Sequence, residues 1–145
     1  MWRNLLWLNA AVTFVLVGLI WTVQVVHYPL FAQVGQAEWR RFHAAHVERI
    51  TWVVAPLMLA EAMLTAALFF PPSPVARSTA FALAAPVIGA WCATMWVAVP
   101  LHQSLEAGLD RAAIASLVSV NWIRTVAWTA RGAGLMWMLW SWPAP

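Results

Sequence analysis

Histidines and arginines recur in a matched pattern within a largely apolar sequence. The pattern occurs twice: His27, His46 and Arg49 form the first copy, and His102, Asn121 and Arg124 form the second. The spacing is the same in both copies, with a histidine first, a second polar side chain later and an arginine one helical turn after that. An ionisable side chain is costly to keep inside a membrane or at its edge. A pattern that keeps such residues twice therefore predicts one functional site built from both copies.

Histidines that converge from separate helices could bind a metal ion. Neutral imidazole is a ligand for zinc, copper and iron, and three histidines with one open position are typical of a catalytic metal site. The candidate ligands are His27, His46 and His102. His43 is a competing ligand because it lies one helical turn before His46 on the same helical face. Asn121 would be a weak fourth ligand or a hydrogen-bond partner of a substrate.

The same residues allow two other interpretations. His27 and His102 occupy equivalent positions in the two copies, so they could ligate the iron of a haem b from opposite sides. Arg49 and Arg124 would then bind the haem propionates or an anionic substrate, since guanidinium suits planar anions. Without a cofactor, the histidines would bind a substrate or quinone and transfer protons. In a purely structural role they would end the helices and donate hydrogen bonds to loop carbonyl groups.

Three further polar residues lie within the apolar runs. Gln24 precedes His27 by one helical turn and is expected to line the same pocket. Glu61 and Arg131 are expected to pair, because aligning the two copies separates them in depth by only about 7.5 Å, which an extended arginine can bridge. We interpret the pair either as a clamp between helices or as a proton-relay carboxylate beneath the histidines, with Arg131 reaching a substrate.

The composition is typical of a membrane protein. The chain has 145 residues, of which 63% are hydrophobic and only 9% are charged. Crossing a bilayer takes roughly 20 apolar residues. A polar segment at 36–47 is expected to form an interfacial helix that runs into the second span. We expect a single transmembrane domain over residues 1–145, with four spans at about 5–26, 50–70, 79–101 and 117–140.

The expected fold is all-α: an integral membrane four-helix bundle made of two related helical hairpins, a parallel internal repeat. Pro29 and Pro100 are expected to end the first and third spans, because proline disfavours helix at the preceding residue. In an up-down-up-down bundle, the ends of the first and third helices share one face with the starts of the second and fourth. The histidines, Asn121 and the two arginines would therefore meet near that face.

The charged residues narrow the range of partners. The net charge of +3 comes from eight Arg and Lys residues, all of them arginine, without a basic tract, so we expect no nucleic acid partner. The expected partners are membrane lipid and a hydrophobic small molecule, with a homo-oligomer or a larger membrane complex as a further possibility. The expected location is the bacterial inner membrane.

Two segments of the second half, 99–108 and 117–136, carry a short motif. VPLHQSL is followed by NWIR, with the matching positions Val99, Pro100, His102, Leu105, Asn121 and Arg124. This part resembles the small four-helix membrane protein family that includes anthrone oxygenases, whose members are mostly of unassigned function. Family members usually have asparagine at the position of His102. The resemblance implies a four-helix membrane fold and oxygenation of an aromatic or polyketide-like substrate.

Together these observations predict a membrane oxidoreductase or oxygenase that acts on a hydrophobic, aromatic or quinone-like small molecule. His27, His46, His102 and Glu61 would be its catalytic residues. The expected cofactor is a transition metal (iron, copper or zinc), a haem b, or none. Substrate binding would fall to Asn121, Arg49, Arg124, Gln24 and Arg131. The alternative is a non-enzymatic binding or accessory subunit of a membrane complex.

Overall fold

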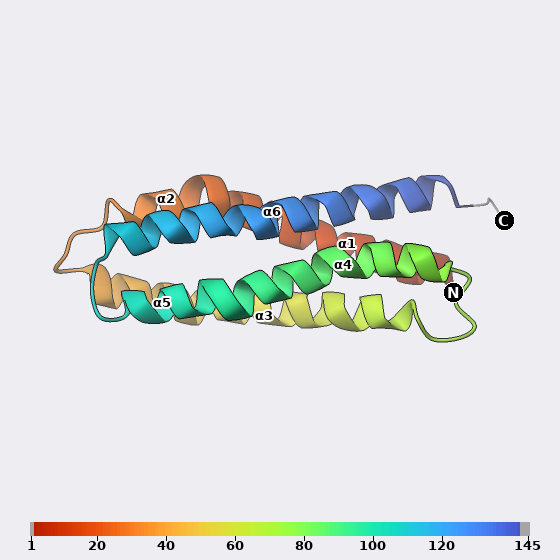
Figure 1. Cartoon of the computed structure of the whole chain (residues 1–145), viewed down its shortest axis with the longest axis horizontal. Helices are drawn as coiled ribbons and strands as arrows, with labels where there is room; N and C mark the ends of the chain where they lie inside the picture. Colours follow the sequence, from red (N-terminus) through yellow and green to blue (C-terminus); the bar gives the residue numbers. More distant parts are fainter. Residues whose placement is uncertain (1, 143–145) are drawn as a thin grey trace.

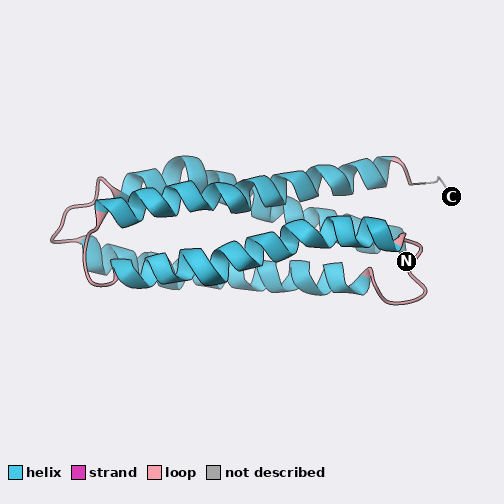
Figure 2. Ribbon diagram, viewed as in Figure 1, coloured by secondary structure: helices cyan, strands magenta, loops and turns pink. Residues whose placement is uncertain are grey.

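Residues 2–142 form four long helical rods, which lie side by side (Figures 1 and 2). A computed structural model describes residues 2–142, and every regular element in this range is a helix. Two of the rods are interrupted by a short π-helical segment. The elements are α1 (Trp2–Thr22), η1 (Val23–His27), α2 (Tyr28–Phe31), α3 (Trp39–Ala67), α4 (Arg77–Ala93), η2 (Thr94–Ala98), α5 (Val99–Leu105) and α6 (Arg111–Trp140).

The rods form a closed bundle in which chain neighbours run antiparallel. Helix α1 packs against α3 and α6, and α4 also packs against α3 and α6. The loop between α2 and α3 lies at the same end as the loop between α5 and α6 (Figure 1). The expected all-helical four-helix bundle is therefore confirmed. Of the polar 36–47 segment, the part from Trp39 onward belongs to α3, which continues to Ala67.

Three of the rods are long and apolar enough to cross a membrane: Trp2–Phe31, Trp39–Ala67 and Arg77–Leu105. The fourth expected span, α6, has a similar length of 30 residues but does not belong to this group. Arg124 and Arg131 lower its mean hydropathy, and both side chains are buried inside the bundle. The hydropathy of α6 thus reflects polar groups that face other helices.

The two prolines at the expected helix ends do not end the rods. Pro29 and Pro100 each lie in the first turn of a short α-helix that follows a π-helical segment. A proline lacks the N–H that an α-helix would use, and a wider turn before it accommodates that loss. As a result the first rod continues to Phe31 and the third to Leu105, beyond the predicted ends.

The π-helical segments also give a different internal alignment from the one that the histidines suggested. They begin at Val23 and Thr94, and the two prolines that follow them are separated by the same interval. This interval is shorter than the one from His27 to His102, so in this register His27 corresponds to Ala98, and Phe31 corresponds to His102. The alignment given by the π-helical segments therefore differs from the one that pairs His27 with His102.

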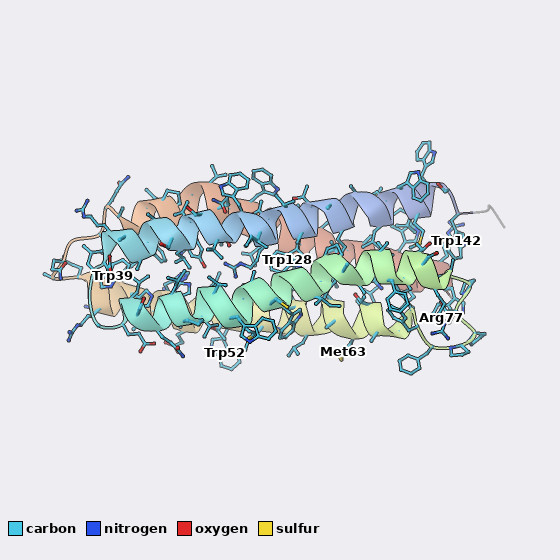
Figure 3. All side chains as sticks on the ribbon, viewed as in Figure 1. Trp39, Trp52, Met63, Arg77, Trp128 and Trp142 are labelled. Carbon is cyan, nitrogen blue, oxygen red and sulfur yellow. The ribbon has the colours of Figure 1, made fainter. Side chains whose placement is uncertain are left out.

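Trp39, at the start of α3, joins the two loops at one end of the bundle. Its side chain is fully buried, and its Nε1 donates a hydrogen bond to the carbonyl oxygen of Leu105 at 2.9 Å. The indole also packs edge-on against Phe31. Figure 3 shows Trp39 at this end, with Arg77 and Trp142 at the other.

We expect Trp39→Phe to lower the free energy of unfolding by about 1 kcal/mol, because an aromatic ring is kept while the hydrogen bond to Leu105 is lost. Thermal unfolding of the purified protein in mild detergent measures this change. Trp52→Phe is the matched control, since Trp52 is 77% exposed and its loss should leave the midpoint unchanged.

Candidate functional site

Four histidines from three rods lie together near the α2–α3 end of the bundle. His27 Nε2 lies 2.7 Å from His46 Nδ1, and His43 Nε2 lies 3.1 Å from His102 Nδ1. The imidazoles of His46 and His102 face each other with ring centroids 5.4 Å apart, which links the two pairs. We call these four residues the histidine row. The expected convergence of His27, His46 and His102 is confirmed, with His43 a full member.

Tyr28 extends the histidine row toward α6. Its hydroxyl lies 3.1 Å from Nε2 of His102 and accepts a hydrogen bond of 3.2 Å from Nη2 of Arg124. The side chain is buried, so it orients His102 and does not belong to a membrane interface. The sequence signal for Tyr28 was its position next to His27, at the end of an apolar run. That position is equally typical of an interfacial tyrosine.

Asn121 and Gln24 hold Arg124 in place through a chain of hydrogen bonds. Arg124 Nη2 donates to the side-chain oxygen of Asn121, whose Nδ2 donates to Oε1 of Gln24 at 2.9 Å. Gln24 Nε2 in turn donates to the carbonyl oxygen of Val118 at 3.1 Å. The expected gathering of Gln24, Asn121 and Arg124 beside the histidines is therefore confirmed. Their hydrogen bonds are mostly to one another, which fixes the direction of the guanidinium.

An apolar cavity of about 370 Å³ opens between α3 and the α4–α5 rod. We call it the α3/α5 cavity. His102, Tyr28 and Arg124 contribute polar groups to its wall, and Glu106 and Gln103 lie at its α5 end. The rest of the lining is largely apolar: Val47, Ile50, Thr51, Val54, Ala55, Met58, Trp91, Thr94, Met95, Ala98 and Val99. This combination of an apolar wall with a few convergent polar groups is typical of a small-molecule site.

Two residues that line this cavity each carry a buried N–H group with no protein partner among the described residues. These groups are Nε of Arg124 and Nε1 of Trp91. A buried donor without a partner costs about 1–3 kcal/mol, so such groups usually meet a water or a ligand. Both donors therefore favour a ligand that brings hydrogen-bond acceptors. Trp91 was not predicted as a site residue, because a tryptophan inside an apolar run has no distinguishing sequence signal.

Arg49 lies apart from Arg124. It is exposed on α3 and lines a second cavity of about 340 Å³ together with His27 and His46. We call this the α1/α3 cavity; its remaining lining residues are Leu19, Phe42, Ala45, Ile50 and Val53. The prediction that the two arginines act on one ligand is therefore wrong in this structure. Arg124 points into the bundle, whereas Arg49 stands on the opposite side of the histidine row.

The histidine row does not have the geometry of a metal centre. Within residues 2–142, no group of three or more His, Cys, Asp or Glu side chains is placed to hold a metal ion. Both ring nitrogens of His102 already lie within hydrogen-bond distance of His43 and Tyr28, so a metal would have to displace those partners. The predicted three-histidine ligand set thus forms a hydrogen-bonded row.

A haem held between His27 and His102 does not fit either. His27 Nε2 faces His46, and His102 Nε2 faces Tyr28, so the two nitrogens do not point toward one common position where an iron could lie. The two arginines are not placed to bind the propionates of one haem, since Arg49 and Arg124 line different cavities. These side-chain positions therefore do not match the haem ligation that the sequence allowed.

Glu61 and Arg131 form a separate buried cluster toward the middle of the bundle. Arg131 Nε lies 3.0 Å from Glu61 Oε1, and both residues are 1% exposed. The expected ion pair between the second and fourth rods is confirmed. All three guanidinium nitrogens donate to acceptors within the bundle: Glu61 and Thr13 for Nε, the Leu83 carbonyl for Nη1, and Asn9 and Thr65 for Nη2.

Both carboxylate oxygens of Glu61 also accept hydrogen bonds from within the bundle. Oε1 accepts from Thr13 at 2.9 Å as well as from Arg131, and Oε2 accepts from Nε1 of Trp128 at 2.8 Å. Arg131 lies two helical turns beyond Arg124 on α6, about 10 Å along the helix. The geometry of this cluster is that of a clamp between four rods, set apart from the α3/α5 cavity and from a substrate bound there.

Comparison with protein-family models, with curated proteins and with solved structures finds no match to this chain.

Proposed function

We propose that this chain is an integral membrane protein that binds a hydrophobic, aromatic or quinone-like small molecule in the α3/α5 cavity and acts on it as an oxidoreductase. One observation carries the proposal: an apolar cavity between two rods ends on a buried arginine whose Nε has no partner among the described residues, beside a tyrosine and a histidine that contact each other. A membrane-dissolved molecule with a carbonyl or phenol oxygen matches that wall.

The outer surface of the bundle supports placement in a membrane. Large apolar side chains point outward, among them Trp52 and Met63 in Figure 3, and Trp96 and Trp137 are also largely exposed. Many large exposed apolar side chains are uncommon in soluble proteins. The charged side chains of Glu61, Arg124 and Arg131 are instead buried between the rods, as expected where lipid surrounds a bundle.

The polar wall suits proton transfer to or from an oxygen of the ligand. In this proposal Arg124 Nε donates a hydrogen bond to a carbonyl oxygen of the quinone, which stabilises the negative charge that develops on this oxygen as the quinone ring is reduced. The Tyr28 hydroxyl or the imidazole of His102 supplies a proton to this oxygen, and His43 replaces the proton on His102. Reduction of a quinone to its hydroquinone takes two electrons, supplied in this proposal by a separate electron-donor protein of the membrane, and two protons, of which Tyr28 or His102 provides the one at the oxygen bound by Arg124. The resemblance of 99–108 and 117–136 to the family of anthrone oxygenases is in line with an aromatic substrate.

A binding or accessory subunit without turnover would use the same cavity. It is favoured by the occupied ring nitrogens of His102, which give that side chain a clear positioning role. The two functions differ in one measurable respect: only an oxidoreductase changes the redox state of a bound quinone when an electron donor is supplied.

The cavity itself can be tested by filling it. Ala55 lines it from α3, so Ala55→Trp should abolish saturable binding of a short-chain quinone, measured by quenching of tryptophan fluorescence in detergent or by calorimetry. Ala130→Trp is the matched control, because Ala130 is exposed on α6 and lines none of the described cavities. Equal binding by wild type and the Ala55→Trp variant, with both folded, would contradict the proposed site.

A further inference from the structure

We propose that the α1/α3 cavity is a second binding site, for a glycerophospholipid of the surrounding bilayer. Its phosphate would bind Arg49 beside His46, and one acyl chain would lie along Leu19 and Val53. This inference uses the membrane placement proposed above but concerns a different cavity, on the other side of the histidine row from the α3/α5 cavity.

The polar end of the cavity presents positive charge and an unmet hydrogen bond. Arg49 is exposed and forms no ion pair with any residue of the described range. His46 is only 7% exposed, and its Nε2 has no hydrogen-bond partner in that range, although Nδ1 contacts His27. The neighbouring Glu48 does not line the cavity. An anion with several acceptor oxygens, such as a phosphate, would satisfy both groups.

The depth of Arg49 along α3 fits a lipid headgroup. It is the last exposed charge before an apolar stretch from Ile50 to Ala67, in which only the buried Glu61 is charged. That stretch spans about 27 Å, close to the thickness of the hydrocarbon layer. Arg49 therefore lies at the level where lipid phosphates meet the acyl chains. A free phosphate ion would make no favourable contact with the apolar wall of the cavity.

The remaining wall suits an acyl chain. Leu19 from α1 and Ile50 and Val53 from α3 are apolar, and Val53 is half exposed toward the outside of the bundle. Ile50 also lines the α3/α5 cavity, so this side chain borders both sites. A lipid seated here would hold Ile50 and His46 in position from the side opposite the substrate.

The test compares a phospholipid with the same lipid lacking its headgroup. Delipidated protein in detergent is titrated with dioleoylphosphatidylglycerol, with dioleoylglycerol and with inorganic phosphate, and binding is counted by native mass spectrometry. We expect phosphatidylglycerol to bind at least about fivefold more tightly than dioleoylglycerol, since one arginine near a membrane surface contributes about 1 kcal/mol toward an anionic lipid. Arg49→Ala should remove this preference, and Val53→Trp should prevent binding of either lipid.

Two matched variants serve as controls. Arg41→Ala removes an exposed arginine of α3 that does not line the cavity, and Val126→Trp adds a tryptophan on the exposed face of α6; both should leave lipid binding unchanged. A preference that survives Arg49→Ala, or that Arg41→Ala removes equally, would overturn the inference. The inference would also be overturned if inorganic phosphate displaced phosphatidylglycerol while dioleoylglycerol did not bind, because the cavity would then be a site for a phosphate ion. Quinone binding in the α3/α5 cavity reports separately on the proposed function.

Discussion

Replacing Arg131 with methionine is expected to lower the free energy of unfolding by about 3–5 kcal/mol, the largest effect of any single substitution proposed for this bundle. The change leaves the carboxylate of Glu61 buried at 1% exposure without its counter-charge. It also removes donors from Asn9, Thr65 and the carbonyl oxygen of Leu83. Thermal unfolding in detergent, followed by circular dichroism, measures the loss.

The double variant Glu61→Met with Arg131→Met separates the charge from the packing. With both partners removed no unpaired charge remains, so the double variant should be less destabilised than Arg131→Met alone. Arg77→Met is the control for loss of an arginine as such, because Arg77 is exposed at the start of α4 (Figure 3). The single variant Glu61→Met completes the comparison. If the double variant loses as much stability as Glu61→Met and Arg131→Met added together, the pair is not coupled and the clamp is not supported.

Arg124→Met is expected to weaken binding of a quinone in the α3/α5 cavity by about ten- to 150-fold, since a hydrogen bond from a charged group contributes about 1.5–3 kcal/mol. Methionine keeps an unbranched side chain in the space but removes Nε, which has no partner among the described residues, and Nη2, which positions Tyr28. Fluorescence quenching or calorimetry with a short-chain quinone gives the affinity directly.

Tyr28→Phe distinguishes a direct contact of Arg124 with the ligand from an indirect one. The phenylalanine keeps the ring but loses the hydroxyl that contacts both Arg124 and His102. If Arg124 binds the ligand through Nε, Tyr28→Phe should cost less affinity than Arg124→Met. Equal losses would make Arg124 a positioning residue for Tyr28. An unchanged affinity for Arg124→Met, in a variant that unfolds at the wild-type midpoint, would refute the site at this wall.

The sequence alone predicts the number of rods, the order of the helices and the end of the bundle where the histidines meet. These follow from apolar run lengths and from an alternating up-down chain path, which leaves few possible arrangements. The pairing of Glu61 with Arg131 was predictable for a related reason, because the two charges fall at similar depth in the second and fourth apolar runs, and Glu61 is the only acid in those runs. The family resemblance carried by Pro100, Asn121 and Arg124 stays a prediction.

Other features depended on the rotation of each rod about its own axis, which a sequence pattern does not specify to within one side chain. The π-helical turns before Pro29 and Pro100 shift the residues that follow them around the helix, so Tyr28 turns inward to His102. Arg49 and Arg124, which spacing treats as equivalent, face opposite sides of the histidine row. Imidazoles at the same depth can either surround one point or form a row. Side-chain packing decides between these arrangements through shifts of a few ångströms, and only the tertiary structure shows such shifts.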